Sequence, residues 1–275
     1  MRSINTPTIS QEYDEILIHV KWTAPTPLDL HQADGGLLVE PPHRTGSTSA
    51  GIVVEVGPDV KHFSFGDRIL DGFSLEQVVT LLENLVTAFN TISADLGLPT
   101  PWPKPEGYVP PRAKGKVLIW GASSSVGQLT IAVLKLYGYR HSKGAEEVFD
   151  YRSPSVVDDF LKTYQEGDAS AFPLIVDCVG SQAGSVDALF KVAQSGATIA
   201  IMLPVIFMHA TEEEAPEYSM DANTSAPWAG GVSLEIIPSL IADGYVTPDR
   251  FPTKALDSFW KGMSGKKLIW RASEE

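Results

Sequence analysis

Two hydrophobic periods divide the chain. Residues 15–22 (EILIHVKW) carry apolar side chains at every second position, and residues 49–57 (SAGIVVEVG) form a second short apolar run. Alternation with a period of two is typical of half-buried strands. Gly and Pro turns separate these runs from a third at residues 60–70, which predicts a small β-rich domain in this part of the chain.

A period of three to four begins at residue 74 and predicts a helix that ends at Gly97. Apolar residues recur through this stretch at helical spacing, and Ser74 is a suitable N-cap. The proline-rich residues 99–111 cannot continue the helix, so we expect a surface linker there.

Residues 116–138 (KVLIWGASSSVGQLTIAVLKLYG) are the most informative stretch. A four-residue apolar strand, a loop of small residues and an apolar helix follow one another, and Gly138 is placed as a helix C′ residue. Nucleotide-binding α/β units begin in this way, because small side chains let backbone amides approach a pyrophosphate at a helix N-terminus. The loop is not a strict G-x-G-x-x-G, so an ordinary βα turn rich in Ser and Gly is the alternative.

Strands and helices alternate through the second half of the chain. We expect strands at residues 147–150, 174–179, 197–203 and 267–271, and helices at residues 156–164, 186–193 and 234–242. Uninterrupted apolar strands that alternate with helices predict a parallel sheet covered on both faces. Residues 208–228 are polar, acidic and interrupted by proline, which predicts a loop over the cleft.

Composition narrows the classes of function. With 21 basic and 34 acidic residues the net charge is −13, which argues against nucleic acid or a membrane surface as a partner. Cys178 is the only cysteine, so neither a disulfide within the chain nor a cysteine cluster for metal can form. The sequence shows no signal segment and no apolar stretch of about 18 residues, which predicts a cytoplasmic location.

Six short motifs follow one another in the order of a known family. They are GSTSAG (46–51), VEVGP (54–58), FGDR (65–68), GASSSVG (121–127), DCVG (177–180) and GKKLI (265–269). The series resembles the medium-chain dehydrogenase/reductase superfamily, especially its zinc-independent quinone oxidoreductases and the fungal trans-acting enoyl reductases that serve polyketide synthases. The resemblance implies an α/β fold with two domains. A GroES-like catalytic domain would comprise residues 1–75 and 251–275, and a Rossmann-like cofactor-binding domain residues 76–250.

The resemblance also implies a chemistry. Members of this branch are NAD(P)H-dependent reductases. They transfer hydride from nicotinamide C4 to the β-carbon of an enoyl or other activated C=C bond, after which the α-carbon is protonated. NADPH is the expected cofactor and NADH the alternative. The substrate would be a small hydrophobic or acyl compound, presented by a polyketide synthase, and the protein a monomer or a homodimer.

The resemblance assigns residues to the cofactor and none as the general acid. The assigned residues are Gly121, Ala122, Ser123, Ser124, Ser125, Val126 and Gly127 for the pyrophosphate, Cys178, Val179, Gly180, Met202 and Leu203 beside the nicotinamide, and Tyr151 near the adenosine end. Several of these residues have a structural role as the alternative. In that interpretation Gly180 only ends a strand, Tyr151 covers a sheet edge, and Cys178 is a core residue. Asp29 either faces the site or caps the helix that follows it.

Zinc is not expected. Zinc-dependent relatives carry Gly-His-Glu where this chain has Gly46, Ser47 and Thr48, and a cysteine ligand before it that is also missing here. The six histidines are scattered, and no pair has helical ligand spacing.

The chain is shorter than the family pattern at several points. Only residues 139–143 separate Gly138 from Gly144, the point where relatives begin their third strand, whereas a strand plus a helix needs about 20 residues. One Rossmann strand–helix unit is therefore missing, together with the Ser and Lys that hold the 2′-phosphate in relatives. We predict that residues 147–150 fill the second-strand position, which would place Asp150 at the ribose and favour NADH. Arg152 and Lys143 would instead favour NADPH.

Further shortenings lie near residues 67–74 and 253–260. They leave a second hypothesis open, in which the chain is a cofactor-free, non-redox protein derived from this family (cyclase-like or ligand-binding) or a pseudoenzyme. A mis-spliced gene model would produce the same gaps.

Overall fold

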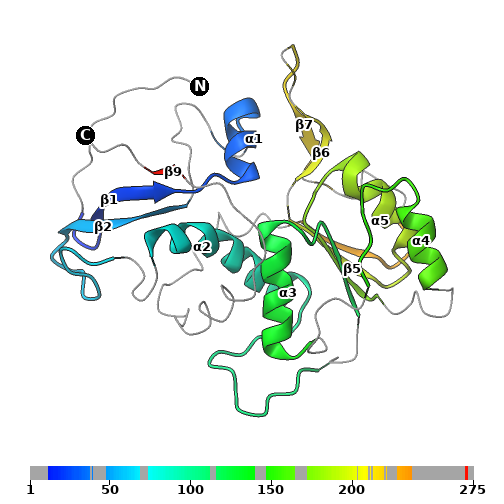
Figure 1. Ribbon diagram of the computed structural model, residues 1–275, viewed down its shortest axis with the longest axis horizontal. Coiled ribbons are helices and arrows are strands. Elements are labelled where there is room, and N and C mark those ends of the chain that lie inside the picture. Colours follow the sequence, from blue (N-terminus) through cyan, green and yellow to red (C-terminus); the bar gives the residue numbers. More distant parts are fainter. Residues whose placement is uncertain are drawn as a thin grey trace. The chain divides into compact units, whose positions relative to one another are not determined.

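The computed structural model describes residues 12–37, 39, 48–68, 74–111, 116–139, 147–164, 172–202, 204–209, 211, 213–219, 221, 228–236 and 270–271. Figure 1 shows the elements in sequence colours. The chain divides into two compact units. The first comprises Met1–Glu83, Thr253–Asp257 and Ser264–Glu275, and the second Asn84–Pro252 and Ser258–Met263.

An antiparallel sheet forms the first unit. Its strand order is β2-β1-β9, from β2 (Ser49–Val56), β1 (Ile16–Thr23) and β9 (Trp270–Arg271). The alternating apolar runs predicted as strands are therefore confirmed, and the described end of the predicted closing strand pairs with β1. Helix α1 (Pro27–Gly35) follows β1.

Helix α2 (Leu75–Asn90) spans the division between the units. Its predicted N-cap is confirmed: Ser74 Oγ accepts from Gln77 N (3.3 Å), and Gln77 Oε1 accepts from Ser74 N (3.0 Å). This reciprocal pair is a capping box, which satisfies two amides that the helix itself cannot. A π-helical turn, η1 (Thr91–Asp95), continues the helix toward the predicted end at Gly97.

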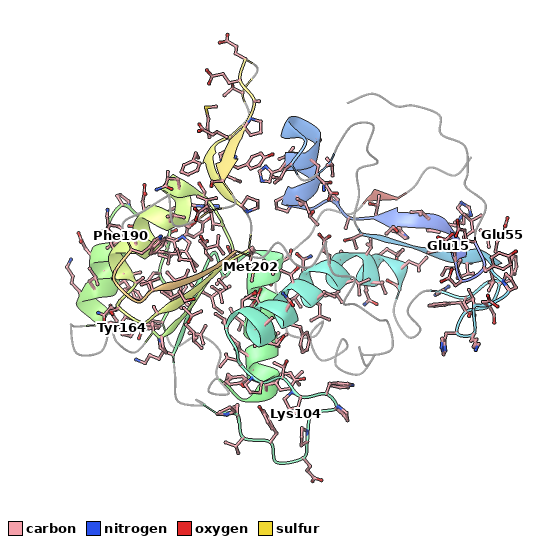
Figure 2. The ribbon with its side chains drawn as sticks, turned by 180° about the vertical axis from the view of Figure 1, so that it is seen from behind. Glu15, Glu55, Lys104, Tyr164, Phe190 and Met202 are labelled. Carbon is pink, nitrogen blue, oxygen red and sulfur yellow. The ribbon has the colours of Figure 1, made fainter. Side chains whose placement is uncertain are left out.

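The proline-rich linker forms a strap, residues 99–111, that is hydrogen-bonded to the C-terminal end of α3 (Ser125–Tyr137) and to Tyr139 just after it. Tyr139 Oη donates to Pro99 O (2.8 Å), Tyr137 Oη donates to Pro101 O (3.2 Å), and Lys104 Nζ donates to Leu136 O (2.6 Å). Burial raises the pKa of both tyrosines, so their hydroxyls remain protonated donors. Figure 2 labels Lys104 on this strap.

The second unit is built on a parallel sheet, as predicted. Its strand order is β3-β4-β5-β8, with β3 (Val117–Trp120), β4 (Leu174–Asp177), β5 (Thr198–Ile201) and β8 (Ser233–Ile236). All three neighbouring pairs are parallel and without register shifts. The α/β class is therefore confirmed.

Helices cover this sheet on both faces. Helix α4 (Val156–Thr163), the π-helical turn η3 (Gln182–Val186) and helix α5 (Asp187–Val192) pack on one face, and α3 lies on the other (Figure 1). Buried side chains from alternate strand positions and from α4 and α5 form the core on the first face, including Trp120, Phe160, Ile175, Leu189 and Ile201.

The strand predicted at residues 147–150 is wrong. Among the described residues nothing pairs with the outer edge of β3, and β4 lies directly beside it. Val148 is 84% exposed, whereas Phe149 packs its ring against Phe160 (centroids 5.7 Å apart). Aromatic packing against α4 has taken the place of strand pairing. The positions of the second and third strands of a six-stranded Rossmann sheet are thus both unfilled in the described part of the chain.

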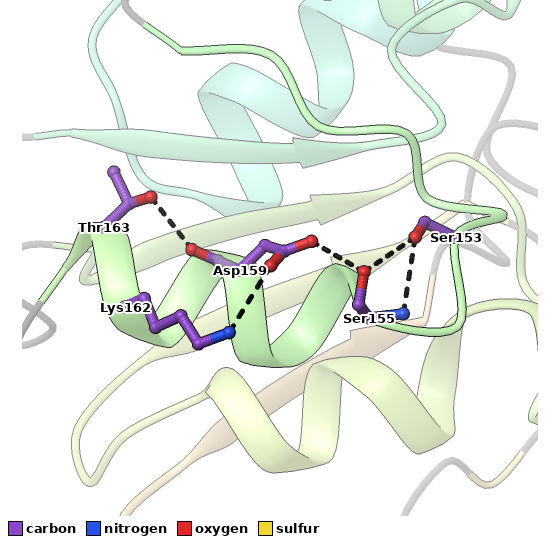
Figure 3. Close-up of polar contacts among 5 residues, drawn as sticks. All are labelled: Ser153, Ser155, Asp159, Lys162 and Thr163. Atoms are coloured by element: carbon purple, nitrogen blue, oxygen red, sulfur yellow. Dashed lines mark hydrogen bonds and ion pairs between the residues drawn. The ribbon is translucent and has the colours of Figure 1, made fainter.

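A tight turn then leads into α4 (Figure 3). Arg152 N donates to Asp150 Oδ1 (3.0 Å), and Ser155 Oγ donates to Asp159 Oδ2 (2.7 Å). Asp159 also forms an exposed ion pair with Lys162 (3.8 Å), and its carbonyl accepts from Thr163 Oγ1 (2.8 Å). Side-chain bonds of this kind favour a turn over an extended ladder.

Two other predictions are corrected. The helix predicted at residues 234–242 begins instead as strand β8, because its apolar residues pair with β5 at the sheet edge, and residues 237–242 lie outside the described residues. The loop predicted at residues 208–228 contains part of an antiparallel hairpin, β6 (Val205–Met208) with β7 (Glu217–Ser219).

Candidate functional site

The glycine loop after β3 has the geometry predicted from its small residues. Gly121 has φ +74°, and Ser124 caps α3 by accepting a hydrogen bond from Gly127 N (3.1 Å). A Cβ on Gly127 would lie 2.8 Å from both Ala122 Cα and Gly121 O. Only glycine therefore allows the helix to sit this close to its own loop, which is one of the roles of glycine in dinucleotide-binding turns.

The same helix end offers unpaired donors. The amides of Ser125 and Val126 have no hydrogen-bond partner among the described residues. Both stand in the first turn of a 13-residue helix, where the peptide dipoles add partial positive charge. The loop and helix end therefore suit a phosphate group.

A second loop lies against the first at the end of β4. Cys178 N donates to Trp120 O (3.0 Å), which extends the β3–β4 ladder by one bond. A Cβ on Gly121 would lie 2.8 Å from Val179 Cγ2 and 3.4 Å from Cys178 Cβ. The structure thus brings together the two loops that the resemblance assigned to the pyrophosphate and to the nicotinamide.

A third segment joins them after β5. Met202 N donates to Asp177 O (3.0 Å), and Ile206 N donates to Gly180 O (2.9 Å). Met202 is buried, and Figure 2 labels it where β5 ends. Carboxyl ends of neighbouring parallel strands are where open α/β sheets bind ligands. Leu203 and Lys143 lie outside the described residues.

The Cys178 thiol is poorly suited to act as a nucleophile. Burial raises its pKa, the Asp177 carboxylate beside it raises the pKa further, and the hydrogen bond with the Ser124 side chain opposes these effects only in part. A thiol with a raised pKa stays protonated at neutral pH and reacts slowly. This agrees with the interpretation of Cys178 as a packing residue.

Tyr151 lies beside Trp120, the last residue of β3. Its ring is 6.2 Å from that of Trp120, and the Arg152 guanidinium lies 5.5 Å from the Tyr151 ring centroid. Asp150 belongs to the turn before α4 and to no strand, so its predicted placement on a second strand is wrong.

In the first unit, Asp29 acts as a cap. Its Oδ2 accepts from Thr26 N (2.6 Å) and from Thr26 Oγ1 (2.8 Å), and its side chain is buried. Helix capping, one of the two roles considered for Asp29, is therefore a role that it fills in the structure.

Sequence reasoning missed Asp177. This last residue of β4 is fully buried, and its carboxylate accepts from Val179 N (2.8 Å), Gly180 N (3.2 Å) and Ser185 Oγ (2.6 Å). The available signal was an acidic residue at the end of an otherwise apolar strand, followed by glycine and serine.

No group of three or more His, Cys, Asp or Glu side chains among the described residues is arranged to hold a metal ion. Within the same residues, no helix combines the length and the apolar character needed to cross a membrane.

Known families and proteins are similar in sequence to this chain. The alcohol dehydrogenase GroES-like domain family matches residues 12–82. The trans-enoyl reductase himH of Aspergillus japonicus is 28% identical over 327 aligned positions, which cover 93% of this chain and 89% of that protein. This alignment is longer than the chain itself, so the relative carries segments with no counterpart here. The enoyl reductase component of lovastatin nonaketide synthase, lovC of Aspergillus terreus, is 25% identical over 94% of this chain and 89% of its own.

Solved structures share the fold. The quinone oxidoreductase of Escherichia coli, complexed with NADPH, superposes with a TM-score of 0.62 over 94% of this chain and 80% of that chain, at 17% identity. Because the GroES-like match lies in the first unit and the glycine loop opens the parallel sheet of the second, we conclude that this chain belongs to the medium-chain dehydrogenase/reductase superfamily, in the branch of quinone oxidoreductases and enoyl reductases.

Proposed function

We propose that the protein is an NAD(P)H-dependent reductase of activated C=C bonds. One observation carries the proposal: three loops meet at the carboxyl ends of β3, β4 and β5, beside a helix that presents unpaired amides. Ligand sites of open α/β sheets lie at such an edge. The names of the fungal relatives, a trans-enoyl reductase and an enoyl reductase component, support this reaction class.

The nicotinamide cofactor supplies the hydride when bound, and the chain supplies binding and orientation. The amides of Ser125 and Val126 would hold the pyrophosphate at the start of α3. Residues 178–180 and Met202 would lie beside the nicotinamide. The neutral Cys178 thiol packs there and donates no charge to the site.

The proposed cofactor is NADPH. Its 2′-phosphate needs a cation, and the exposed Arg152 guanidinium lies over the Tyr151 ring near the end of β3. NADH would instead be favoured by an acidic residue at the end of a second strand, and the described chain places no strand there. Replacing Arg152 with Ala is expected to lower the affinity for NADPH about tenfold and the affinity for NADH less than twofold, as measured by calorimetry.

The proposed substrate is an enoyl or related acyl compound made by a polyketide synthase. This part of the proposal is supported by lovC, whose name describes it as a component of a nonaketide synthase. The direct assay follows NADPH oxidation with a crotonyl thioester, alone and attached to a carrier protein. Turnover of the carrier-bound form alone would support presentation by a synthase.

Replacing Ser125 with Pro tests the phosphate site sharply. Ser125 is the first residue of α3, where proline fits a helix and removes only the amide donor. Ser124 has φ −66° and ψ 160°, which is the conformation that a following proline requires. We expect about tenfold weaker NADPH binding with unchanged thermal stability. Ser125→Ala, which keeps the amide, is the matched control. Equal affinity of the two variants would contradict the site.

The cofactor-free alternative rests on the lateral edge of the sheet, at β3. Among the described residues nothing extends the sheet beyond β3, which is where a Rossmann domain holds adenosine. A flat fluorescence titration of the wild-type protein with both NADPH and NADH would establish this alternative and refute the reductase.

A further inference from the structure

Asp177 is a buried carboxylate at the carboxyl end of β4, in the middle of the proposed cofactor site. In the sheet register it lies between Trp120 of β3 and Ile201 of β5, and its side chain is fully buried. Oδ1 accepts the amides of Val179 and Gly180, and Oδ2 accepts the Ser185 hydroxyl at 2.6 Å. Both oxygens are therefore occupied by groups from the turn that follows β4.

Burying a carboxylate without a counter-ion is unfavourable. No basic side chain in the described part of the chain forms an ion pair with Asp177, and burial raises its pKa even though the three hydrogen bonds oppose this shift. A neutral side chain would cost less at this position. The carboxylate therefore serves the shape of the turn better than it serves the stability of the core.

The turn that Asp177 holds is the one against the glycine loop. Val179 and Gly180 are tied to Oδ1, and Val179 Cγ2 reaches to within 2.8 Å of where a Gly121 Cβ would be. A small displacement of residues 178–180 would therefore either collide with Gly121 or open a gap beside it. Close packing transmits such shifts.

The second oxygen extends the network to β3. Ser185 Oγ accepts from Ser181 N (3.1 Å) while donating to Asp177; Ser185 belongs to η3, and Ser181 is the N-cap of that turn. In the same turn, Gly184 O accepts from Trp120 Nε1 (3.0 Å), and Trp120 directly precedes Gly121. The two loops are thus joined both by direct contact and through η3. Short π-helical turns of this kind are frequent at functional sites.

We propose that Asp177, whose second oxygen is held by Ser185, is a positioning residue that sets residues 178–180 against the glycine loop and so orients the nicotinamide half of the cofactor. The inference rests on the proposed function, because it assigns this turn to the nicotinamide. It predicts a separable effect: loosening the turn weakens binding of the nicotinamide half and leaves the adenosine half bound as before.

Ser185→Ala tests this separation. It removes one hydroxyl and leaves Asp177 Oδ2 without a donor. Two ligands are titrated by calorimetry: NADPH, and adenosine 2′,5′-bisphosphate, which carries the adenosine half and lacks the nicotinamide. We expect NADPH to bind on the order of tenfold more weakly and the bisphosphate to bind within twofold of the wild-type affinity. Ser195→Ala is the matched control, because it also removes a serine donor to an oxygen at 2.6 Å, on the segment before β5. It should leave both affinities unchanged.

Asp177→Asn keeps the inference testable if Ser185→Ala does not fold. Asparagine preserves the size and the acceptor for Val179 and Gly180, but its hydrogen bonds are neutral and therefore weaker. We expect NADPH to bind about threefold more weakly, again with unchanged bisphosphate affinity. Equal loss for both ligands, or loss for neither, would overturn the positioning role. A wild-type protein that binds neither ligand would refute the proposed function itself, and the inference with it.

Discussion

Replacing Gly127 with Ala tests the loop geometry on which the site depends. Gly127 is the third residue of α3 and is buried. An added Cβ would lie 2.8 Å from Ala122 Cα and from Gly121 O, and 3.0 Å from Ala122 C. All three are backbone atoms, so no side chain can rotate away to make room.

The size of the effect follows from that clash. Ordinary Cβ contacts begin at 3.4 Å, so the loop must move away from the helix by about 0.6 Å. Overpacking of this kind costs roughly 1–3 kcal/mol, while alanine gains up to about 1 kcal/mol over glycine in a helix. We therefore expect a net loss of about 1 kcal/mol in the free energy of unfolding. Because Gly121 packs on Val179, the same shift disturbs the second loop, and NADPH binding should weaken by about tenfold.

The assay pairs urea unfolding with calorimetric titration of NADPH. Gly230→Ala is the control, since a Cβ there meets open space. An alanine at position 127 that gains stability and binds NADPH like the wild type would refute the close packing of loop and helix.

Three further predictions concern single contacts. Burial raises the pKa of Asp177 in the folded state, so the native state binds this proton more tightly than the unfolded state, and the stability from this group is lost as pH rises through the folded pKa. Asp177→Asn does not titrate, so its free energy of unfolding in urea should exceed that of the wild type by a margin that grows between pH 4 and 7. A margin that stays constant over this range would contradict the prediction. Tyr139→Phe removes the hydroxyl bonded to Pro99 O and should cost about 1 kcal/mol in the free energy of unfolding, with no change in NADPH affinity. Ser74→Ala removes half of the capping box with Gln77 and should cost about 1 kcal/mol by the same assay, whereas Ser74→Asp should restore it.

Local signals were enough to predict the site segment. The strand, loop and helix of residues 116–138 follow from an apolar run, small residues and a terminal glycine, and Gly138 has φ +81° as a left-handed helix end requires. The role of Ser74 as an N-cap could be predicted for the same reason, because a capping box involves only four consecutive residues. These features depend only on near neighbours in the chain.

Two predictions failed because tertiary partners decided the outcome. Residues 147–150 carry only two apolar side chains, and Phe149 finds better packing on Phe160 than a strand edge would offer. The apolar residues from 234 onward fit a helix and a strand equally well, and the neighbouring edge of β5 decides for a strand. Asp177 was overlooked because its role appears only when the turn after β4 folds back over it.

The pairing of β9 with β1 has a consequence for the order of folding. Arg271 pairs with Trp22 and Trp270 with Thr23, so this ladder closes over about 250 residues of chain. Contacts this distant in sequence form slowly. During synthesis β1 leaves the ribosome early but its partner is made far later, so the sheet of the second unit can assemble while the first sheet still lacks its third strand. Domains usually complete in the order in which they are made; here the part that is made first is completed last.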